Sequence, residues 1–297
     1  MPMPEDESSW DQLNVMFATS AGTVRRNDLS DFVNIHRTGK IAMKLEDPNS
    51  PESGGVADRL IGVATCDDKN DVLLSTRSGK CIRFEVSDVR VFAGRNSVGV
   101  RGIKLADKDE VISMSILRHV DFDTESRDAY LKMARKLRGG DDADDVVEEN
   151  DNGAANGHAK VLSEEEFKRF QAAEEFILTV THNGFGKRTS AYEYRITGRG
   201  GQGIVSIATS KRNGEVSAAF PVADSDQVMM ITDAGRLIRI PIADIPIKGR
   251  ATQGVTLFST GEDEHVTSVA HLPLEENGGE HGAEDEGDEA PAEEAAG

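Results

Sequence analysis

Cysteine, aromatic residues and long apolar runs are all scarce in this chain of 297 residues. The two cysteines, Cys66 and Cys81, stand in no CxxC or other metal-ligand spacing, so we predict two reduced thiols and neither a disulfide framework nor a zinc site. No apolar run approaches the roughly 20 residues of a membrane span. The leader, residues 1–11, is acidic and has no apolar signal core. We therefore expect a cytoplasmic protein without membrane contacts.

Patterns of catalytic residues are missing as well. The sequence has no P-loop, and its seven histidines are scattered without metal-ligand spacing. Gly198, Gly200 and Gly203 fit G-x-G-x-x-G, but a dinucleotide site needs a helix after the glycines, and IVSIAT, which follows here, is typical of a strand. We therefore expect no catalytic residue, no metal site and no cofactor in this chain.

Acidic residues outnumber basic ones by 53 to 34, which gives a formal net charge of −19. The excess lies in three segments: residues 1–10 carry −3, residues 121–172 carry −6 and residues 275–297 carry −10. Residues 11–120 carry +1 and residues 173–274 carry −1. The acidity therefore belongs to appendages, and the nearly neutral remainder is not excluded from binding a polyanion.

Four segments repeat one pattern in register, which indicates one structural unit used four times. In each, an apolar run leads into a turn glycine and then a basic segment. The turn glycines are Gly22, Gly79, Gly184 and Gly235. Four residues after each glycine stands an arginine: Arg26, Arg83, Arg188 and Arg239. Nine residues after each glycine stands an acidic residue: Asp31, Asp88, Glu193 and Asp244.

Each unit has the pattern of a small antiparallel sheet. Short apolar runs and basic segments flank the turns, where glycine supplies the positive φ of a hairpin. A closing strand is predicted at residues 60–65, 111–117, 216–222 and 266–272. Units of about 50 residues with several strands have the size of propeller blades. We predict an all-β, propeller-like fold of about four blades, with blades one and two in residues 12–120 and blades three and four in residues 173–274.

Residues 121–172 interrupt the repeats. Within them, 126–138 has the periodicity of an amphipathic helix, and a capping box that begins at Ser163 predicts a second helix. The tract between the helices, 139–157, is poor in apolar residues, so we predict that it is disordered. The acidic tail, 275–297, has low complexity and receives the same prediction.

A second signature follows three of the hairpins, with the form Arg, three residues, Gly and an apolar strand. It occupies residues 95–105, 199–209 and 250–260, starting at Arg95, Arg199 and Arg250. The first repeat departs from it, because IHRTGKIAMKL at 35–45 has Ile35 at the arginine position. A glycine-rich loop with an arginine brings backbone amides and a guanidinium close to a phosphate. Phosphate contacts position DNA without reading its sequence.

These repeats resemble the C-terminal domain of DNA gyrase A. The resemblance is carried by TGKIAMKL, SVGVRGIKL, NGFGKRT, ITDAGRLIRIP and GRATQGV, and it covers nearly all of residues 12–274 outside the insertion. The family fold is a β-pinwheel, a propeller-like disc whose outer rim wraps DNA. The family pattern has six blades and a basic Gln-Arg-Arg-Gly-Gly-Lys-Gly box, whereas this chain shows four repeats and no such box.

The resemblance implies a non-catalytic module that wraps DNA and supports ATP-dependent negative supercoiling by a bacterial type II topoisomerase. ATP and Mg would then bind other parts of the holoenzyme. The expected partners are double-stranded DNA, the breakage-reunion part of gyrase A and the gyrase B protein, in the cytoplasm at the nucleoid. Two alternatives stay open: a domain of the topoisomerase IV type, and a protein-interaction propeller or truncated remnant without DNA activity of its own.

Basic residues on the hairpins and loops are the candidate DNA contacts. They are Arg25, Arg26, Lys80, Arg83, Arg95, Lys187, Arg188, Arg199, Arg236, Arg239 and Arg250. The arginines four residues after the turns have a second interpretation, a structural ion pair with the acidic residue five positions further on. Basic residues without an acidic residue at that spacing, among them Arg25, Lys187 and Arg236, are therefore the stronger DNA candidates. We also expect the acidic tail to compete with DNA for the basic rim.

Overall fold

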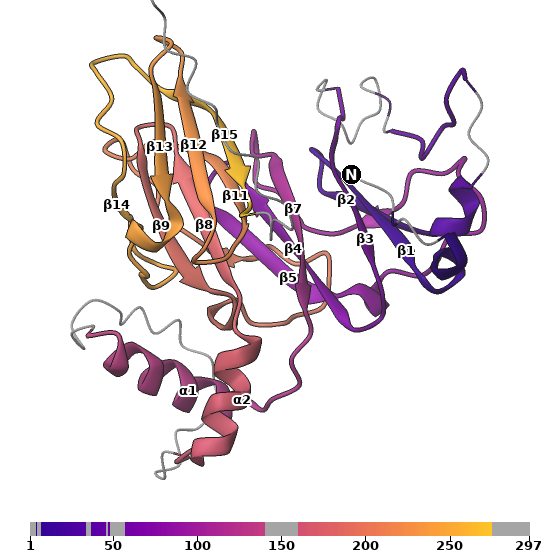
Figure 1. Cartoon of the computed structure of the whole chain (residues 1–297). Coiled ribbons are helices and arrows are strands. Elements are labelled where there is room, and N and C mark those ends of the chain that lie inside the picture. The colour runs from indigo at the N-terminus through magenta and orange to yellow at the C-terminus, as the bar shows by residue number, and fades with distance from the viewer. Residues whose placement is uncertain are drawn as a thin grey trace, which may run out of the picture.

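The computed structural model describes residues 4, 7–33, 37–45, 47, 57–139 and 160–274. Figure 1 shows four sheets that succeed one another across the molecule in chain order, with two helices set below them. The tracts predicted to be disordered, 139–157 (apart from Gly139) and 275–297, lie outside the described residues. No helix in the described part of the chain is both long enough and apolar enough to cross a membrane.

Each repeat supplies a β-hairpin and a third strand that pairs with the first strand of that hairpin. The hairpins are β1–β2 (Asn14–Thr19, Thr23–Asp28), β4–β5 (Asn70–Thr76, Lys80–Glu85), β8–β9 (Phe176–Thr181, Phe185–Ser190) and β12–β13 (Gln227–Thr232, Leu237–Pro241). The third strands are β3 (Leu60–Cys66), β7 (Val111–Arg118), β11 (Val216–Val222) and β15 (Val266–Leu272). These strands confirm the predicted hairpins and closing strands.

A fourth strand reaches three of the sheets from the next repeat. It is β6 (Val100–Arg101) beside β2, β10 (Ile204–Val205) beside β5, and β14 (Val255–Thr256) beside β9. The sheet orders are β3-β1-β2-β6, β7-β4-β5-β10, β11-β8-β9-β14 and β15-β12-β13. The sequence predicted strands after the Arg-x-x-x-Gly loops, but it did not predict that each one joins the preceding blade. We call these short strands donor strands.

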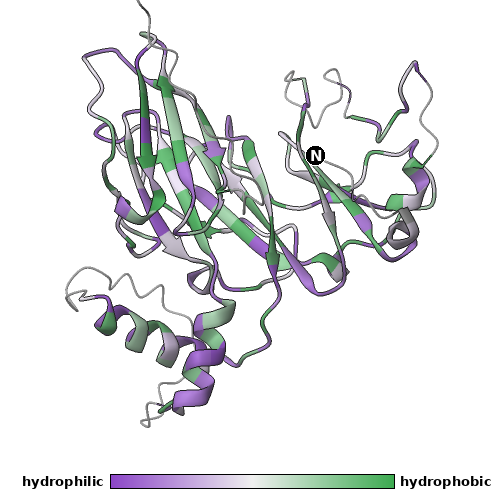
Figure 2. Ribbon diagram, in the orientation of Figure 1, coloured by the Kyte–Doolittle hydropathy of each residue, from purple (hydrophilic) through white to green (hydrophobic). Residues whose placement is uncertain are grey.

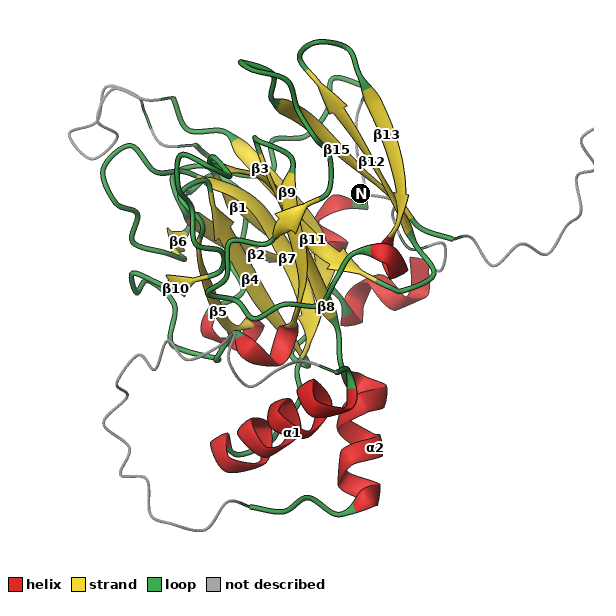
Figure 3. Ribbon diagram, turned by 90° about the vertical axis from the view of Figure 1, so that its left-hand side faces the viewer, coloured by secondary structure: helices red, strands yellow, loops and turns green. Residues whose placement is uncertain are grey.

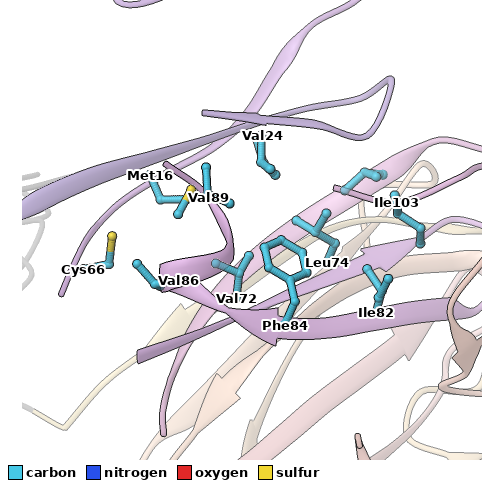
Figure 4. Close-up of a cluster of buried hydrophobic side chains, with 12 residues drawn as sticks. Met16, Val24, Cys66, Val72, Leu74, Ile82, Phe84, Val86, Val89 and Ile103 are labelled. Carbon is cyan, nitrogen blue, oxygen red and sulfur yellow. The ribbon is translucent and has the colours of Figure 1, made fainter. Parts of the chain in front are cut away.

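Consecutive sheets pack against one another through apolar side chains. Since β3 contacts β7, β7 contacts β11 and β11 contacts β15, the third strands form the inner side, and the donor strands lie on the outer edges. Figure 4 shows the cluster between the first two sheets, where Met16 and Val24 of the first hairpin meet Val72, Leu74 and Phe84 of the second. Similar clusters fill the other two junctions. Facing sheets of consecutive blades therefore bury their apolar side chains against each other, as predicted for stacked repeats.

The insertion between the second and third repeats contains the two predicted helices. α1 (Thr124–Leu137) begins two residues earlier than the expected 126–138, because the Asp123 side chain caps its first turn. α2 (Glu164–Ala173) begins after Ser163, whose side chain and Glu166 form the predicted capping box.

The helices are held to the third repeat by a small aromatic cluster. Tyr130 of α1 and Phe170 of α2 pack with Tyr192, which follows β9. The Tyr130 hydroxyl donates a 2.8 Å hydrogen bond to Glu174, which also pairs with Arg138. Figure 2 shows that α2 consists largely of hydrophilic residues. The insertion is thus an appendage that packs on the third blade in one defined position.

The turn glycine of the third hairpin leaves no room for a side chain. A Cβ atom on Gly184 would lie 2.0 Å from the carbonyl oxygen of Phe258, which follows the donor strand β14. A Cβ atom on Gly235, the equivalent glycine of the fourth hairpin, would meet nothing within 4 Å. Both glycines have positive φ, 74° and 78°, so an alanine at either position has the same backbone strain.

We expect Gly235→Ala to lower the free energy of unfolding by about 1 kcal/mol, the cost of the left-handed backbone. Gly184→Ala should lower it by about 3 kcal/mol, because overpacking against Phe258 adds about 1–3 kcal/mol. Urea unfolding of the two variants measures the difference. Equal losses would show that the incoming segment does not close over Gly184.

Candidate nucleic-acid interface

The arginines four residues after the turns connect consecutive repeats. Each of the first three donates to a backbone carbonyl at the 3-10 turn of the next repeat: Arg26 to Val86 (3.3 Å), Arg83 to Ala191 (2.7 Å) and Arg188 to Ile245 (2.6 Å). These three arginines are buried, at 5%, 4% and 6% exposed. Arg239 of the fourth repeat is exposed and donates to the Gln227 side chain of its own hairpin.

The three buried arginines pair with carboxylates other than the predicted ones. Arg83 lies 2.7 Å from Asp71, and both side chains are buried. Arg26 pairs with Asp68 and Arg188 with Asp224. The predicted ion pairs with the acidic residues five positions further on are therefore wrong in these repeats. Burial and carbonyl partners make these arginines structural, and their predicted position on a DNA-facing surface is contradicted.

Arg25 and Lys187, two of the stronger DNA candidates, are fully buried. Arg25 Nη1 donates to the Ser97 carbonyl at 2.6 Å, and Lys187 Nζ donates to the Gly249 and Arg250 carbonyls, also at 2.6 Å. Burial, with a smaller effect of nearby Arg90, lowers the pKa of Arg25. The expectation that these cations face DNA is contradicted, because β2 and β9 each have a strand on either side and carbonyls of the following repeat accept hydrogen bonds from both cations.

Arg236 has an acidic partner that the sequence pattern did not reveal. Its Nε donates to Glu264 at 2.7 Å, and Glu264 also accepts from the Thr232 hydroxyl and from the Gly261 N–H. These hydrogen bonds, above all the one from Arg236, lower the pKa of Glu264 to about 2. The Arg236 side chain nevertheless remains 48% exposed, so the pair holds this cation at the surface.

The three loop arginines form a ladder along the outer edge. Each donates to the carbonyl two residues after the glycine of the preceding loop: Arg95 to Ile41 (2.8 Å), Arg199 to Arg101 (3.1 Å) and Arg250 to Val205 (2.8 Å). Backbone bonds join the same loops, from Lys104 N–H to Gly201 at 2.8 Å and from Ala208 N–H to Thr252 at 3.1 Å. The loops of all four repeats therefore lie side by side.

We call residues 37–45, 95–105, 199–209 and 250–260 together the donor row. They contain eight basic residues and no Asp or Glu, although the chain carries −19 overall. The eight are Arg37, Lys40, Lys44, Arg95, Arg101, Lys104, Arg199 and Arg250. Figure 3 shows β6 and β10, which belong to this row, next to each other along one side of the molecule.

Exposed residues of the donor row were missed by the sequence interpretation. Lys44, Arg101 and Lys104 are exposed, whereas the hairpin arginines that repeat in register are mostly buried. Their signal was the glycine of each loop, since Lys44 and Lys104 both stand five residues after it. The hairpin arginines that recur in register are thus mostly structural, whereas these three cations of the donor row lie on the surface.

Lys80 and Lys104 both line a pocket of about 250 Å³, together with Gln202 and Asp109. Both lysines belong to the second repeat, Lys80 on β5 of its hairpin and Lys104 on the segment that follows the donor strand β6. Such a pair suits one phosphate group of an extended polyanion. Among the described residues, no group of three His, Cys, Asp or Glu side chains is placed to hold a metal ion.

Arg83→Met should lower the free energy of unfolding by about 3–5 kcal/mol, because it leaves the Asp71 carboxylate buried without its cation. Arg239→Met, at the same position of the fourth repeat, should change it by less than about 0.5 kcal/mol, because this side chain is exposed. Chemical unfolding measures both values. A small loss for Arg83→Met would mean that the buried arginines do not hold the repeats together.

Comparison with known proteins agrees with this architecture. The family model described as DNA gyrase C-terminal domain, beta-propeller, matches residues 13–48, 70–118, 175–223 and 226–273. These four segments are the four repeats, and both helices of the insertion fall outside them.

Full-length relatives are similar over nearly the whole chain. The DNA gyrase A protein of Granulibacter bethesdensis is 50% identical over 98% of this chain and 30% of its own length. The DNA gyrase A protein of Rickettsia bellii is 43% identical over 91% of this chain and 28% of its own length. The chain thus spans less than a third of the curated relatives it matches.

Solved structures share the fold at low sequence identity. A DNA gyrase A C-terminal domain matches with a TM-score of 0.59 and 18% identity, over 89% of this chain and 67% of that domain. The C-terminal domain of a DNA topoisomerase IV matches with a TM-score of 0.63 and 18% identity, over 91% of this chain and 64% of that one. With the family match over four repeats, these findings establish that the chain belongs to the DNA gyrase C-terminal domain family of beta-propellers.

Proposed function

We propose that this chain is a DNA-binding and DNA-wrapping module of a bacterial gyrase A protein, without catalytic activity of its own. The observation that carries the proposal is the donor row, which concentrates eight basic residues without a single acidic one on the outer edge of an acidic protein. A surface of one sign that continues from blade to blade suits the regularly spaced charges of duplex DNA.

Binding in this proposal depends on phosphate contacts and carries no sequence preference. The row offers guanidinium and ammonium groups together with the backbone of glycine-rich loops, which are typical phosphate partners. Because the loops lie side by side on consecutive blades, a duplex that follows them bends around the outer edge. Such a bend costs elastic energy of about 1–6 kcal/mol for a short site, which additional phosphate contacts offset.

The module acts with other proteins in this proposal. Its partners are the breakage-reunion part of gyrase A and the gyrase B protein, and its place is the cytoplasm at the nucleoid. ATP and Mg bind those other parts, and this chain contributes the wrapped DNA that ATP-dependent negative supercoiling requires.

Two other functions have weaker support. A topoisomerase IV role is less well supported, since the relatives with 50% and 43% identity are gyrase proteins and the topoisomerase IV structure shares the fold at 18% identity. A protein-interaction propeller without DNA activity is supported mainly by the net negative charge of the chain. The acidic residues that cause this charge lie outside the donor row.

The salt dependence of duplex binding tests the DNA proposal. Each neutralised phosphate contributes about −0.9 to the slope of log K against log salt. Arg101→Gln with Lys104→Gln should therefore reduce the magnitude of the slope by about 2. Fluorescence anisotropy of a labelled duplex at several salt concentrations measures it.

A control variant removes the same number of positive charges at positions outside the donor row. Lys69→Gln with Lys168→Gln removes two exposed cations, on the turn before β4 and on α2, and should leave the slope unchanged. If both double variants change the slope equally, binding depends on net charge and not on the donor row. If the parent chain binds no duplex at low salt, the proposed function is wrong.

Removal of residues 275–297 tests the expected competition by the acidic tail. The tail carries ten acidic residues, so a chain ending at Leu274 should bind duplex DNA more tightly than the full chain, and more so at low salt. The ratio of the two dissociation constants at two salt concentrations is the measurement. An unchanged constant at low salt would contradict the competition.

A further inference from the structure

The second, third and fourth repeats each place a pair of residues beside the buried hairpin arginine of the preceding repeat. The pairs stand 11 and 12 residues after the turn glycines: Arg90 and Val91, Arg195 and Ile196, and Pro246 and Ile247. Parallel bridges join Val91 to Arg26, Ile196 to Arg83 and Ile247 to Arg188. The donor strands pair with residues two and three positions before these arginines, so the pairs and the donor row share the outer edge.

Arg90 is an exposed cation that the fold holds in place. Its guanidinium carbon lies 4.2 Å from the centre of the Phe92 ring, and that of Arg25 lies 4.5 Å from the same ring. Phe92 is itself fixed, because its N–H donates to the Arg26 carbonyl at 2.8 Å and its carbonyl accepts from the Asn27 side chain at 2.9 Å. Among the described residues, no carboxylate pairs with Arg90. A stacked guanidinium is therefore positioned at the surface, where it can meet an anion.

The third repeat has an equivalent cation in a different setting. Arg195 lines a pocket of about 200 Å³ together with Gly198, Gly201 and Gly203 of the loop that follows it. A guanidinium beside a glycine-rich loop is a typical phosphate partner, because the backbone can approach the anion closely. Two consecutive repeats thus present a basic residue at the same position of the outer edge.

Each of these two cations is followed by an exposed β-branched residue. Val91 is 39% exposed and Ile196 is 38% exposed, whereas the apolar residues at the sheet junctions are buried. The backbone of DNA alternates charged phosphates with less polar sugars, and proteins contact both. A basic side chain next to an apolar one therefore matches the chemistry of that backbone.

We propose that Arg90, Val91, Arg195 and Ile196 form a second contact strip for double-stranded DNA, beside the donor row. This inference rests on the proposed function and adds to it a set of residues with two kinds of contact. The arginines bind phosphates, and the two β-branched side chains pack on deoxyribose. Residues 89–105 and 194–209 contain no Asp or Glu, so the positive charge of the strip continues into that of the donor row. A duplex on the outer edge then meets cations at two positions along β2 and β5.

Charge-removing variants test the phosphate contacts. Arg90→Gln and Arg195→Gln, made separately, should each reduce the magnitude of the slope of log K against log salt by about 1, since each neutralised phosphate contributes about −0.9. Arg90→Lys keeps the charge and should keep the slope. Fluorescence anisotropy of a labelled duplex measures binding, and unchanged thermal melting establishes that each variant is folded.

The matched control is an arginine in a similar setting outside the outer edge. Arg169 is exposed on α2, and its guanidinium carbon lies 4.9 Å from the centre of the Phe170 ring. Arg169→Gln should leave the slope unchanged. An unchanged slope in Arg90→Gln, or an equal change in Arg169→Gln, would overturn the strip.

Val91→Thr with Ile196→Thr tests the sugar contacts. Threonine keeps the β-branched shape, whereas its hydroxyl reduces the apolar area that a duplex can cover. Affinity should fall about threefold to tenfold at every salt concentration, with an unchanged slope because no charge is removed. Val161→Thr, which replaces an 87% exposed valine outside the strip, should bind like the parent chain.

The outcomes separate the strip from the proposed function. If the parent chain binds the duplex and the donor-row variant changes the slope, while all strip variants bind like the parent, the strip is wrong and the proposed function stands. If the parent chain binds no duplex at low salt, both are wrong. A changed slope in Val91→Thr with Ile196→Thr would contradict packing on the sugars, because these residues would then act through nearby charges.

Discussion

The exchange of one short segment between neighbouring repeats is the interaction on which the rest of the molecule depends. Each incoming segment donates two N–H groups to the carbonyl of a turn glycine. In the opposite direction, the hairpin arginine donates to a carbonyl at the 3-10 turn of the next repeat. Because each of the first three blades is completed by its successor, the blades are held in a fixed order and spacing. The apolar clusters between sheets then form at each junction.

The same exchange separates structural from surface cations. The hairpin arginines of the first three repeats each serve one junction, so they are buried and satisfied by carbonyls and carboxylates, as Arg83 is by Ala191 and Asp71. Cations of the donor segments, such as Arg101 and Lys104, lie on the outer edge. The basic surface therefore results from the position of the donor segments on the outer edge. It is continuous because hydrogen bonds join each loop to the next.

Much of the fold was predictable from the sequence because its signals are local. Apolar runs, turn glycines and the capping box at Ser163 each act within a few residues, and the hairpins and helices follow them closely. The site was predicted less well. Arg25 and Lys187 look unpaired in the sequence, yet carbonyls more than 60 positions away accept their hydrogen bonds. Glu264, the partner of Arg236, stands 28 positions away, beyond any local pattern.

The sequence by itself determined the number of repeats, the all-β class, the place of the insertion and the segregation of charge, because each is a property of residues close together in the chain. Only the tertiary structure decided which basic residues are exposed and which blade each donor strand completes. The physical reason is that strand pairing between repeats and the burial that results depend on contacts over long sequence separations, such as that between Gly79 and Ile207.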